Sequence, residues 1–309
     1  MCADLTPFAP EQVQYPGVAE SIDSDVDNLL RLVRMAAVLP KGLYVEDAVT
    51  VAKRELREEC DYTRELSYQL KFREMLAARP VSGVSVPAAV PELSAGQVIA
   101  TQLVPGVALD RVAELPRATR DRVGERILEL ALASLFELRT LQSDPNWGNF
   151  LYDDESDTLH MIDFGASKEY DQTFVEDYLR MVYACAERDA DAVRELSISL
   201  GFLTGDESAA MIRTHCEAGF VVGEPFAHEG IYDFGSSDRM TTRVASLGKG
   251  MLEHRLTPPP EAAYSLHRSL SGAFLACMKL GARVPARRML LDTYERVLGG
   301  DGNRLRATA

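Results

Sequence analysis

The sequence is poor in several features that would decide its class at once. Its five cysteines are scattered and form no Cys-x-x-Cys pair, so a disulfide framework is disfavoured and a reduced environment is favoured. No apolar run reaches the ~18 residues that cross a bilayer, because Glu129 and Glu137 interrupt the longest candidate, ILELALASLFEL. Basic residues are outnumbered 47 to 33 by acidic ones, and the net charge of −14 argues against nucleic acid and against strong docking on anionic lipid.

Motifs of several enzyme classes are also missing. The sequence contains no Gly-x-Ser-x-Gly and no His-Glu-x-x-His. Its five histidines show no metal-ligand spacing. The glycine-rich segment 299–303 lacks the preceding strand and following helix that a phosphate loop needs. The helical segments share no common period, which excludes a helical-repeat protein.

One stretch does carry the pattern of a reaction. Asp144 is followed five positions later by Asn149, and an Asp-Phe-Gly triplet begins fourteen positions further on, at Asp163. In a kinase-like site the first Asp orients or deprotonates the attacking group, while the Asn amide oxygen and the second Asp hold Mg²⁺ on a nucleotide's phosphates. Either motif alone is weak and arises by chance, but the two together and in order favour phosphoryl-transfer chemistry.

The elements predicted around this stretch follow the order in which a kinase large lobe builds its catalytic and metal loops. Apolar residues at helical spacing predict a helix over 120–141, followed by short strands at 149–152 and 159–162 around a turn. Elsewhere the pattern predicts strands over 84–90 and 98–103. Further helices are predicted over 23–38 (ended by Pro40 and Gly42), 45–78, 174–187, 190–200, 205–219, 240–255 and 260–280.

The sequence around these motifs resembles the UbiB (aarF-domain) family of atypical kinases, and within it the mitochondrial branch that acts in coenzyme Q biosynthesis. The resemblance runs from Val13 to about Tyr294 and rests on QSDPNWGNFLYD, MIDFGASKEYD, VQYPGVAESIDSDVDNLL, RELREECDYTRE, GFLTG, GEPF, YDFG and PPPEAAYSLHRSLSGAFL. It implies an α+β, atypical protein-kinase-like fold with a helix-rich large lobe and an incomplete small lobe. The expected division is a partial small lobe with a long αC-type helix over 1–104, a large lobe with the catalytic and metal loops over 105–298, and a flexible tail over 299–309.

The same resemblance assigns roles to three acidic residues in RELREECDYTRE. It makes Glu65 the αC glutamate that pairs with a strand lysine, and Glu59 and Asp61 the Glu-x-Asp motif, so that all three organise the nucleotide-binding small lobe. From the residues alone a solvated helix face stays open as the alternative, because two arginines of this stretch lie four positions before acids and can pair with them.

Gln12 occupies the position of the family's strand lysine. In the family VQYPGV directly follows that lysine, and the residues ahead of Gln12 leave no room for the Ala-rich phosphate loop, the first strands or the N-terminal extension. We therefore expect an N-terminally truncated chain, with a genuine short form that binds nucleotide poorly as the alternative. The first residues, MCADLTPFAPEQ, contain no Arg and predict neither a signal peptide nor a mitochondrial presequence.

Two departures from ordinary protein kinases bear on the substrate. His-Arg-Asp is replaced by Gln142-Ser143-Asp144, so a phosphorylated activation loop has lost its usual anchor. No Ala-Pro-Glu follows Asp163, which puts the usual platform for a peptide substrate in doubt.

The function implied by the resemblance is an atypical kinase-like ATPase or phosphotransferase that supports ubiquinone (coenzyme Q) biosynthesis. ATP and Mg²⁺ are the implied cofactors, and the expected acceptor is a small molecule or lipid rather than a protein. The implied location is mitochondrial, with ubiquinone precursors or coenzyme Q biosynthetic proteins as partners and peripheral membrane contact left open. The alternative is a non-catalytic, pseudokinase-like scaffold or a gene-model fragment, because the lysine and the phosphate loop are missing.

Overall fold

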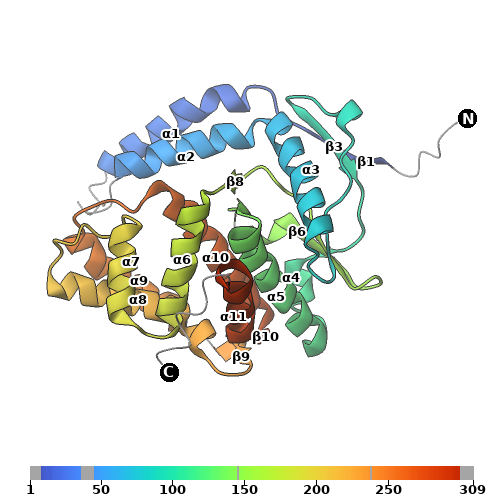
Figure 1. Ribbon diagram of the computed structural model, residues 1–309. Helices are drawn as coiled ribbons and strands as arrows, with labels where there is room; N and C mark the ends of the chain where they lie inside the picture. The colour runs from blue at the N-terminus through green and yellow to red at the C-terminus, as the bar shows by residue number, and fades with distance from the viewer. Residues whose placement is uncertain (1–7, 36–44, 145, 237–238, 300–309) are drawn as a thin grey trace, which may run out of the picture. The chain divides into compact units, whose positions relative to one another are not determined.

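The computed structural model describes residues 8–35, 45–144, 146–236 and 239–299 (Figure 1). Its elements divide into two compact units. The first unit draws on described residues of 8–35, 45–114 and 142–168, and the second on those of 115–141 and 169–299. Every site residue expected from the sequence therefore lies in the first unit.

The first unit combines four helices with two small sheets. The helices are α1 (Val18–Met35), α2 (Val45–Glu59), α3 (Tyr62–Ala78) and α4 (Leu109–Val112). The strands are β1 (Phe8–Val13), β2 (Val84–Ser85), β3 (Val98–Gln102), β4 (Val107–Ala108), β6 (Phe150–Asp153) and β7 (Thr158–Met161), with 3₁₀ turns at Pro91–Leu93 and Trp147–Asn149. β1 pairs antiparallel with β3, and the larger sheet has the order β2-β7-β6-β4, in which only β2 and β7 run parallel.

The β6–β7 hairpin confirms the two strands predicted around a turn. Its register pairs Phe150 with Met161 and Asp153 with Thr158. One step beyond the ladder, the N–H of Ile162 donates to the carbonyl of Asn149 over 2.9 Å. The hairpin therefore brings Asn149 and the residue after Ile162, Asp163, to the same end of the sheet.

Helix α3 packs one face against β3 and against Phe164, which follows β7. Its buried residues recur at helical spacing: Glu65, Gln69, Phe72 and Leu76. The Phe72 ring lies 5.5 Å from the ring of Phe164, and the Gln69 amide donates to the carbonyl of Pro87 and the hydroxyl of Thr101. The helix is thus fixed both by aromatic packing and by a satisfied buried amide.

The long helix predicted over 45–78 is two helices, α2 and α3. The break falls at Cys60–Asp61, because the Asp61 side chain caps α3 by accepting from the N–H groups of Thr63 and Arg64. Helix α1 lies beside α2, as Figure 1 shows, with an ion pair of 2.6 Å between Asp27 and Lys53. Periodicity identified the helical residues here but not the cap that interrupts them.

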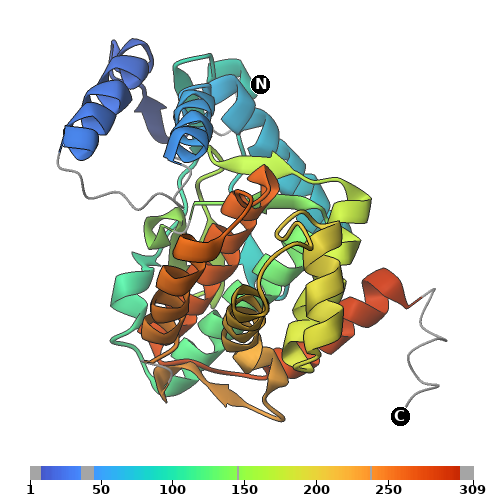
Figure 2. The same ribbon diagram turned by 90° about the vertical axis from the view of Figure 1, so that its left-hand side faces the viewer.

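The second unit is almost entirely helical. Its helices are α5 (Arg117–Leu132), α6 (Gln172–Ala186), α7 (Ala190–Ser199), α8 (Ala209–Ala227), α9 (Arg239–His254), α10 (Glu261–Leu280) and α11 (Ala286–Leu298). Strands β9 (Tyr232–Asp233) and β10 (Arg283–Val284) pair antiparallel, a 3₁₀ turn follows at Phe234–Ser236, and the short strands β5 (Thr140–Gln142) and β8 (Ser167–Glu169) each include residues of both units. Helices α6 and α7 lie side by side (Figure 1 and Figure 2).

Backbone geometry in this unit explains two glycines, one by close approach and one by a positive φ. A Cβ on Gly223 of α8 would lie 2.8 Å from the backbone of Cys185 in α6, so only glycine allows that helix contact. Gly281 ends α10 with a φ of 58°, the left-handed conformation that favours glycine, and the N–H groups of Gly281 and Ala282 satisfy carbonyls of the last turn.

Most of the other predicted elements are confirmed with shifted ends. The helix expected over 120–141 stops at Leu132 and continues as a π-helical turn, Ala133–Glu137, before β5. The strand expected over 84–90 covers two residues, the helix expected over 205–219 runs from Ala209 to Ala227 through Pro225, and α11 was not predicted. The helix expected over 23–38 is α1, whereas its predicted end at Pro40 and Gly42 and most of the predicted tail (300–309) lie outside the described residues.

Among the described helices, none is both long and apolar enough to cross a membrane.

Candidate active site

Asp144 and Asn149 are joined within the loop that leads into β6. Asn149 Nδ2 donates to Asp144 Oδ2 over 2.9 Å, and the backbone N–H of Asn146 donates to Asp144 Oδ1 over 3.3 Å. Asn146 itself caps the 3₁₀ turn by accepting from the N–H of Gly148 over 2.9 Å. Asn149 is only 3% exposed. Because its amide nitrogen is used by Asp144, its Oδ1 is the atom left for a metal ion.

Asp163 lies at the same end of the hairpin, in a turn closed by its own triplet. Its Oδ1 accepts from the N–H of Gly165 over 3.0 Å. Burial raises the pKa of Asp163 above its ordinary value, the Gly165 N–H opposes that rise, and the negative charge of Asp144 adds to it. A divalent cation beside these groups would favour the ionised carboxylate and so reverse the penalty of burial.

The oxygens of Asp163 and Asn149 suit a magnesium ion that also binds water and substrate phosphates. They are too few for a metal site built from protein ligands alone. Across the described residues, no group of three or more His, Cys, Asp or Glu side chains is arranged to hold a metal ion. Asp163 and Asn149 offer one carboxylate and one amide oxygen. Mg²⁺ usually takes only one or two carboxylates from a protein and completes its octahedron with waters and substrate phosphates.

Glu65 is buried beside the metal loop. It is 6% exposed, and its Oε1 accepts from the N–H of Phe164 over 3.5 Å. Burial raises the pKa of Glu65 to about 7, the charge of Asp163 raises it as well, the Phe164 N–H lowers it, and Glu59 adds a smaller rise. The neighbouring charges named here are negative, so a nearby cation would favour the ionised form of Glu65.

Gln12 does not supply that cation. It lies in β1 opposite Ile99 of β3, and its Nε2 donates to the hydroxyl of Tyr62, the first residue of α3, over 3.1 Å. A neutral amide can bridge two strands or helices but cannot offset the charge of Glu65.

The other two acids of the Glu-x-Asp pair differ in their surroundings. Asp61 is committed to capping α3, and its hydrogen bond with the Thr63 side chain is the main cause that lowers the Asp61 pKa. Glu59, the last residue of α2, lies next to the metal loop, where its Cγ would be 3.7 Å from a Cβ on Gly165. The structure thus brings Glu59 and Glu65 to the Asp163 turn and gives Asp61 a local capping function.

Sequence reasoning missed a basic residue between these acids. Arg64 donates from Nη1 to the carbonyl of Gly165 over 2.7 Å and from Nη2 to the carbonyl of Ser167. Its guanidinium also stacks 4.8 Å from the ring centre of Tyr68. The only sequence signal was its place directly before Glu65, which reads equally well as an exposed helix residue.

Ser143 and Lys168 were also missed, because nothing in their sequence positions indicates their contacts. Ser143, at the position of the Arg in His-Arg-Asp, donates from its Oγ (2.9 Å) and its N–H (3.1 Å) to the carbonyl of Ala166. Lys168 pairs with Glu55 of α2 over 2.7 Å, and both side chains are largely buried. Only the fold brings these distant residues together.

The segment after the triplet is short. Only the residues from Ala166 to Asp171 separate Gly165 from the start of α6 at Gln172. Three of them, Ser167 to Glu169, are the strand β8. An activation loop that is switched by phosphorylation has no room in this connection.

Comparison with known proteins identifies the family. A family model described as the ABC1 atypical kinase-like domain matches residues 12–197. The chain belongs to the ABC1 family of atypical kinase-like proteins. It is 46% identical over 283 residues to the atypical kinase COQ8B, mitochondrial, of Danio rerio, covering 92% of this chain and 45% of that protein. It is 35% identical over 284 residues to the atypical kinase COQ8, mitochondrial, of Saccharomyces cerevisiae, covering 92% of this chain and 56% of the relative.

A solved structure supports the fold. The complex of Rv3197 with erythromycin from Mycobacterium tuberculosis matches 93% of this chain and 70% of its own with a TM-score of 0.64 at 20% identity. The family and the α+β, atypical kinase-like fold expected from the sequence are thereby confirmed. The mitochondrial location is confirmed at the level of the family, since several ABC1 relatives carry it in their names. The chain spans about half the length of these curated relatives.

Proposed function

We propose that this ABC1 chain carries the Mg²⁺ and nucleotide site of an atypical kinase-like ATPase or phosphotransferase. The observation that carries the proposal is the convergence of Asp144, Asn149 and Asp163 at one end of the β6–β7 hairpin, with the Asp144–Asn149 hydrogen bond and the raised pKa of the half-buried Asp163. This is the order and placement of groups that phosphoryl transfer needs.

The proposed roles follow from the geometry of each side chain. Asp163 and the Oδ1 of Asn149 would hold Mg²⁺, which when bound neutralises charge on the nucleotide's phosphates. Asp144, held on both oxygens by loop donors, would orient the attacking hydroxyl or water and accept its proton. Glu65 and Glu59 would set the position of the Asp163 turn from the side of α2 and α3.

The acceptor we propose is a small molecule or lipid. The short connection from Gly165 to α6 supports this, because it lacks the length of a peptide-binding platform. The relatives named COQ8 support a role in ubiquinone biosynthesis and mitochondria as the location. The partners we propose are ubiquinone precursors or coenzyme Q biosynthetic proteins. The division into a small lobe over 1–104 and a large lobe over 105–298 belongs to the same proposal.

Nucleotide binding and turnover test the site separately. Mg-ATP and Mg-ADP should each raise the thermal unfolding temperature of the chain, because ligands that bind the folded state stabilise it. Asp144→Asn should keep that shift and lose turnover of ATP, since it removes a proton acceptor and leaves the proposed metal ligands in place. Retained turnover in this variant would rule out the role of Asp144 as a base.

Gln12 favours a second candidate, a non-catalytic scaffold of pseudokinase type. Its neutral amide bonds to Tyr62 where the family has a lysine, and loss of one preorganised cation costs roughly 10²- to 10³-fold in rate by analogy with other electrostatic donors. A cooperatively folded chain with no shift from either nucleotide would favour the scaffold. Gln12→Lys alone should not restore activity if positioning of the phosphates is also missing. Recovery of activity would show that the lysine was the sole deficiency.

A further inference from the structure

The backbone of residues 164–167, which follows Asp163, is held at each residue by a side chain from elsewhere in the first unit. The N–H of Phe164 donates to Glu65, and the carbonyl of Gly165 accepts from Arg64 over 2.7 Å. The carbonyl of Ala166 accepts twice from Ser143. We call the backbone of residues 164–168 the metal-loop segment.

Arg64 is the residue that holds two points of this segment. Its two terminal nitrogens reach the carbonyls of Gly165 and Ser167, on either side of the carbonyl that Ser143 holds. Both bonds are charge-assisted, which makes them stronger than bonds between neutral groups. A planar guanidinium can make this fork, whereas a single ammonium cannot hold the same two acceptors in a fixed geometry.

The guanidinium of Arg64 is itself fixed in place. It lies 4.8 Å from the ring centre of Tyr68, one turn along α3, and 3.4 Å from the carboxylate of Glu58. Its backbone N–H donates to Asp61, the cap that starts the helix. The capping residue, the ring and the carboxylate therefore set the orientation of Arg64 before any ligand binds.

A second ion pair holds the end of the segment. Lys168 Nζ lies 2.7 Å from Glu55, and the two side chains are 18% and 10% exposed. A pair this deep is costly to break from one side, because the remaining charge would be buried without its partner. Residues 164 to 168 are thus held between α2, α3 and Ser143.

We propose that Arg64 is a positioning residue that holds the Asp163 turn in its metal-binding conformation, in place of a phosphorylated activation loop anchored by the missing His-Arg-Asp arginine. The inference rests on the proposed function, since it assigns a regulation to the same site. The permanent charge of Arg64 orders the metal-loop segment, so phosphorylation is not required to order it.

The decisive experiment measures the Mg²⁺ requirement for nucleotide binding in the full chain. Arg64→Met should raise the Mg²⁺ concentration for half-maximal ADP binding by about 10- to 100-fold, the range expected when bonds from a charged donor are lost. ADP binding without metal should stay as in the wild type, because the variant displaces a metal ligand and not the nucleotide contacts. Arg64→Lys should lie between the two, and Arg73→Met, at an exposed position of the same helix, should change nothing.

Amide hydrogen exchange gives a second readout that needs no ligand. In Arg64→Met the amides of the metal-loop segment should exchange faster than in Arg73→Met, while those of α3 beyond its first turn stay protected. Exchange that is unchanged in the segment would overturn the proposal. So would an equal loss of ADP binding with and without Mg²⁺, because that would show a general structural role.

The failure of this inference differs from failure of the proposed function. If Asp163→Asn abolishes Mg²⁺-dependent binding while Arg64→Met behaves as the wild type, the site stands and the positioning role falls. If the wild type shows no Mg²⁺-dependent binding, the proposed function falls, and the exchange of residues 164–168 alone decides whether Arg64 holds the segment. If Arg64→Met does not fold, the same comparisons are made with Arg64→Lys, which must show the smaller shift in both readouts.

Discussion

The chain contains the triplet Asp-Phe-Gly twice, once in each unit. In both copies the glycine N–H donates to the aspartate Oδ1, over 3.0 Å at Asp163 and 2.9 Å at Asp233. In both copies the phenylalanine has no exposed surface and packs against other aromatic rings, Phe164 against Phe72 and Phe234 against Phe274. The two triplets therefore share the hydrogen bond from glycine to aspartate and a buried phenylalanine ring.

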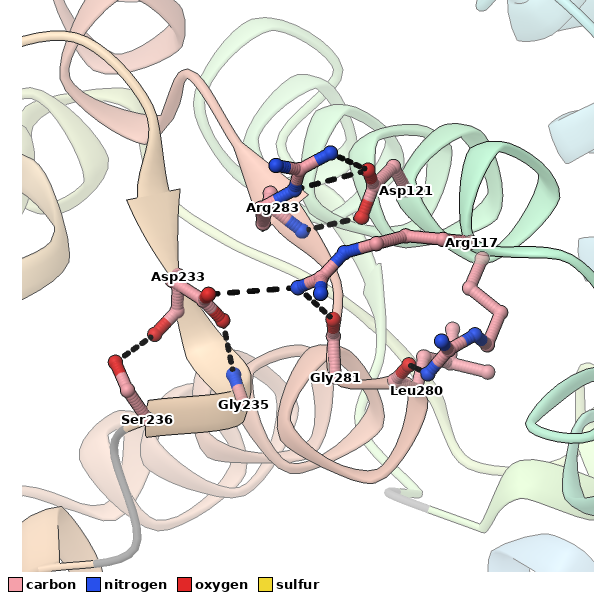
Figure 3. Close-up of polar contacts among 9 residues, drawn as sticks. Arg117, Asp121, Asp233, Gly235, Ser236, Leu280, Gly281 and Arg283 are labelled. Carbon is pink, nitrogen blue, oxygen red and sulfur yellow. Dashed lines mark hydrogen bonds and ion pairs between the residues drawn. The ribbon is translucent and has the colours of Figure 1, made fainter.

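The surroundings of the two aspartates are opposite in charge. Asp163 is half-buried beside Asp144 and Glu65, and partial burial together with the charge of Asp144 raises its pKa. Asp233 is half-exposed and accepts from Arg117 over 3.4 Å, as Figure 3 shows. The same arginine also donates to the carbonyl of Gly281 at the end of α10.

The second triplet has a structural function that its neighbours reveal. A Cβ on Gly235 would lie 3.1 Å from the Cα of Gly281, so the two turns touch through glycines. Beside them Arg283 pairs with Asp121, and strands β9 and β10 pair with each other (Figure 3). Asp-Phe-Gly forms the same hydrogen bond from glycine to aspartate in both units. The neighbouring charges differ, and we propose that they decide whether the aspartate can bind a cation.

The aspartates should respond very differently to neutralisation. Asp163→Asn should abolish Mg²⁺-dependent nucleotide binding, a loss of about 1,000-fold or more, because the carboxylate that we propose binds the metal is removed. Asp233→Asn should leave binding within about twofold, since it lies in a structural corner. Titration of Mg-ADP by calorimetry checks both, and equal effects at the two positions would sink the metal assignment.

The phenylalanines should respond alike. Phe164→Ala and Phe234→Ala should each lower the free energy of unfolding by about 3–5 kcal/mol, because both rings are fully buried and leave a cavity. Denaturant unfolding of each variant of the full chain checks this, with hydrogen exchange used to monitor each unit. A small loss at Phe164 alone would mean that the metal loop moves readily and is not packed as described.

One contribution to the pH dependence of stability should come from Glu65, beside the first triplet. The folded pKa of Glu65 is about 7 against an ordinary value of 4.5, so the folded state binds more protons than the unfolded state between these pH values. Stability contributed by this group should therefore fall by roughly 3 kcal/mol as the pH rises from about 4.5 to 7. Glu65→Gln should remove this contribution to the slope of stability against pH, and Mg-ADP should reduce it. An unchanged slope in the variant would show that Glu65 makes no such contribution.

The smallest effect is expected at the ion pair of the second triplet. Arg117 and Asp233 have side chains 47% and 43% exposed, and exposed pairs contribute about 0–1 kcal/mol. Arg117→Met should change the unfolding temperature only slightly, and 0.5 M salt should have little further effect on the variant. A large loss would show that the contact of Arg117 with Gly281 is what holds the end of α10.

Much of the fold could be predicted from helical periodicity and strand alternation. The helices α6, α7, α9 and α10 begin and end within about two residues of the predicted limits, and α6, α7 and α10 have a buried face. Prediction failed where a local cap competes with periodicity, as at Asp61 between α2 and α3. It also failed at Pro225, which lies inside α8 although proline normally ends a helix.

The candidate site was predictable only where spacing along the chain carries the chemistry. Asp144, Asn149 and Asp163 lie within 20 residues, in a loop and hairpin whose register follows from the sequence. Arg64, Ser143 and Lys168 act through backbone carbonyls and one buried ion pair across up to 113 positions, for which no sequence motif exists. Their types and spacings are ordinary until the fold brings them together.

The sequence by itself determined the family, the kinase-like order of elements and the three residues of the proposed metal and base positions, because those depend on residue type and short-range spacing. Only the tertiary structure decided which Asp-Phe-Gly aspartate lies among carboxylates and which is paired with an arginine, and which residues hold the metal-loop segment. The physical reason is that desolvation and the field of neighbouring charges depend on contacts between distant parts of the chain. Identical triplets therefore acquire different chemistry from the residues that fold around them.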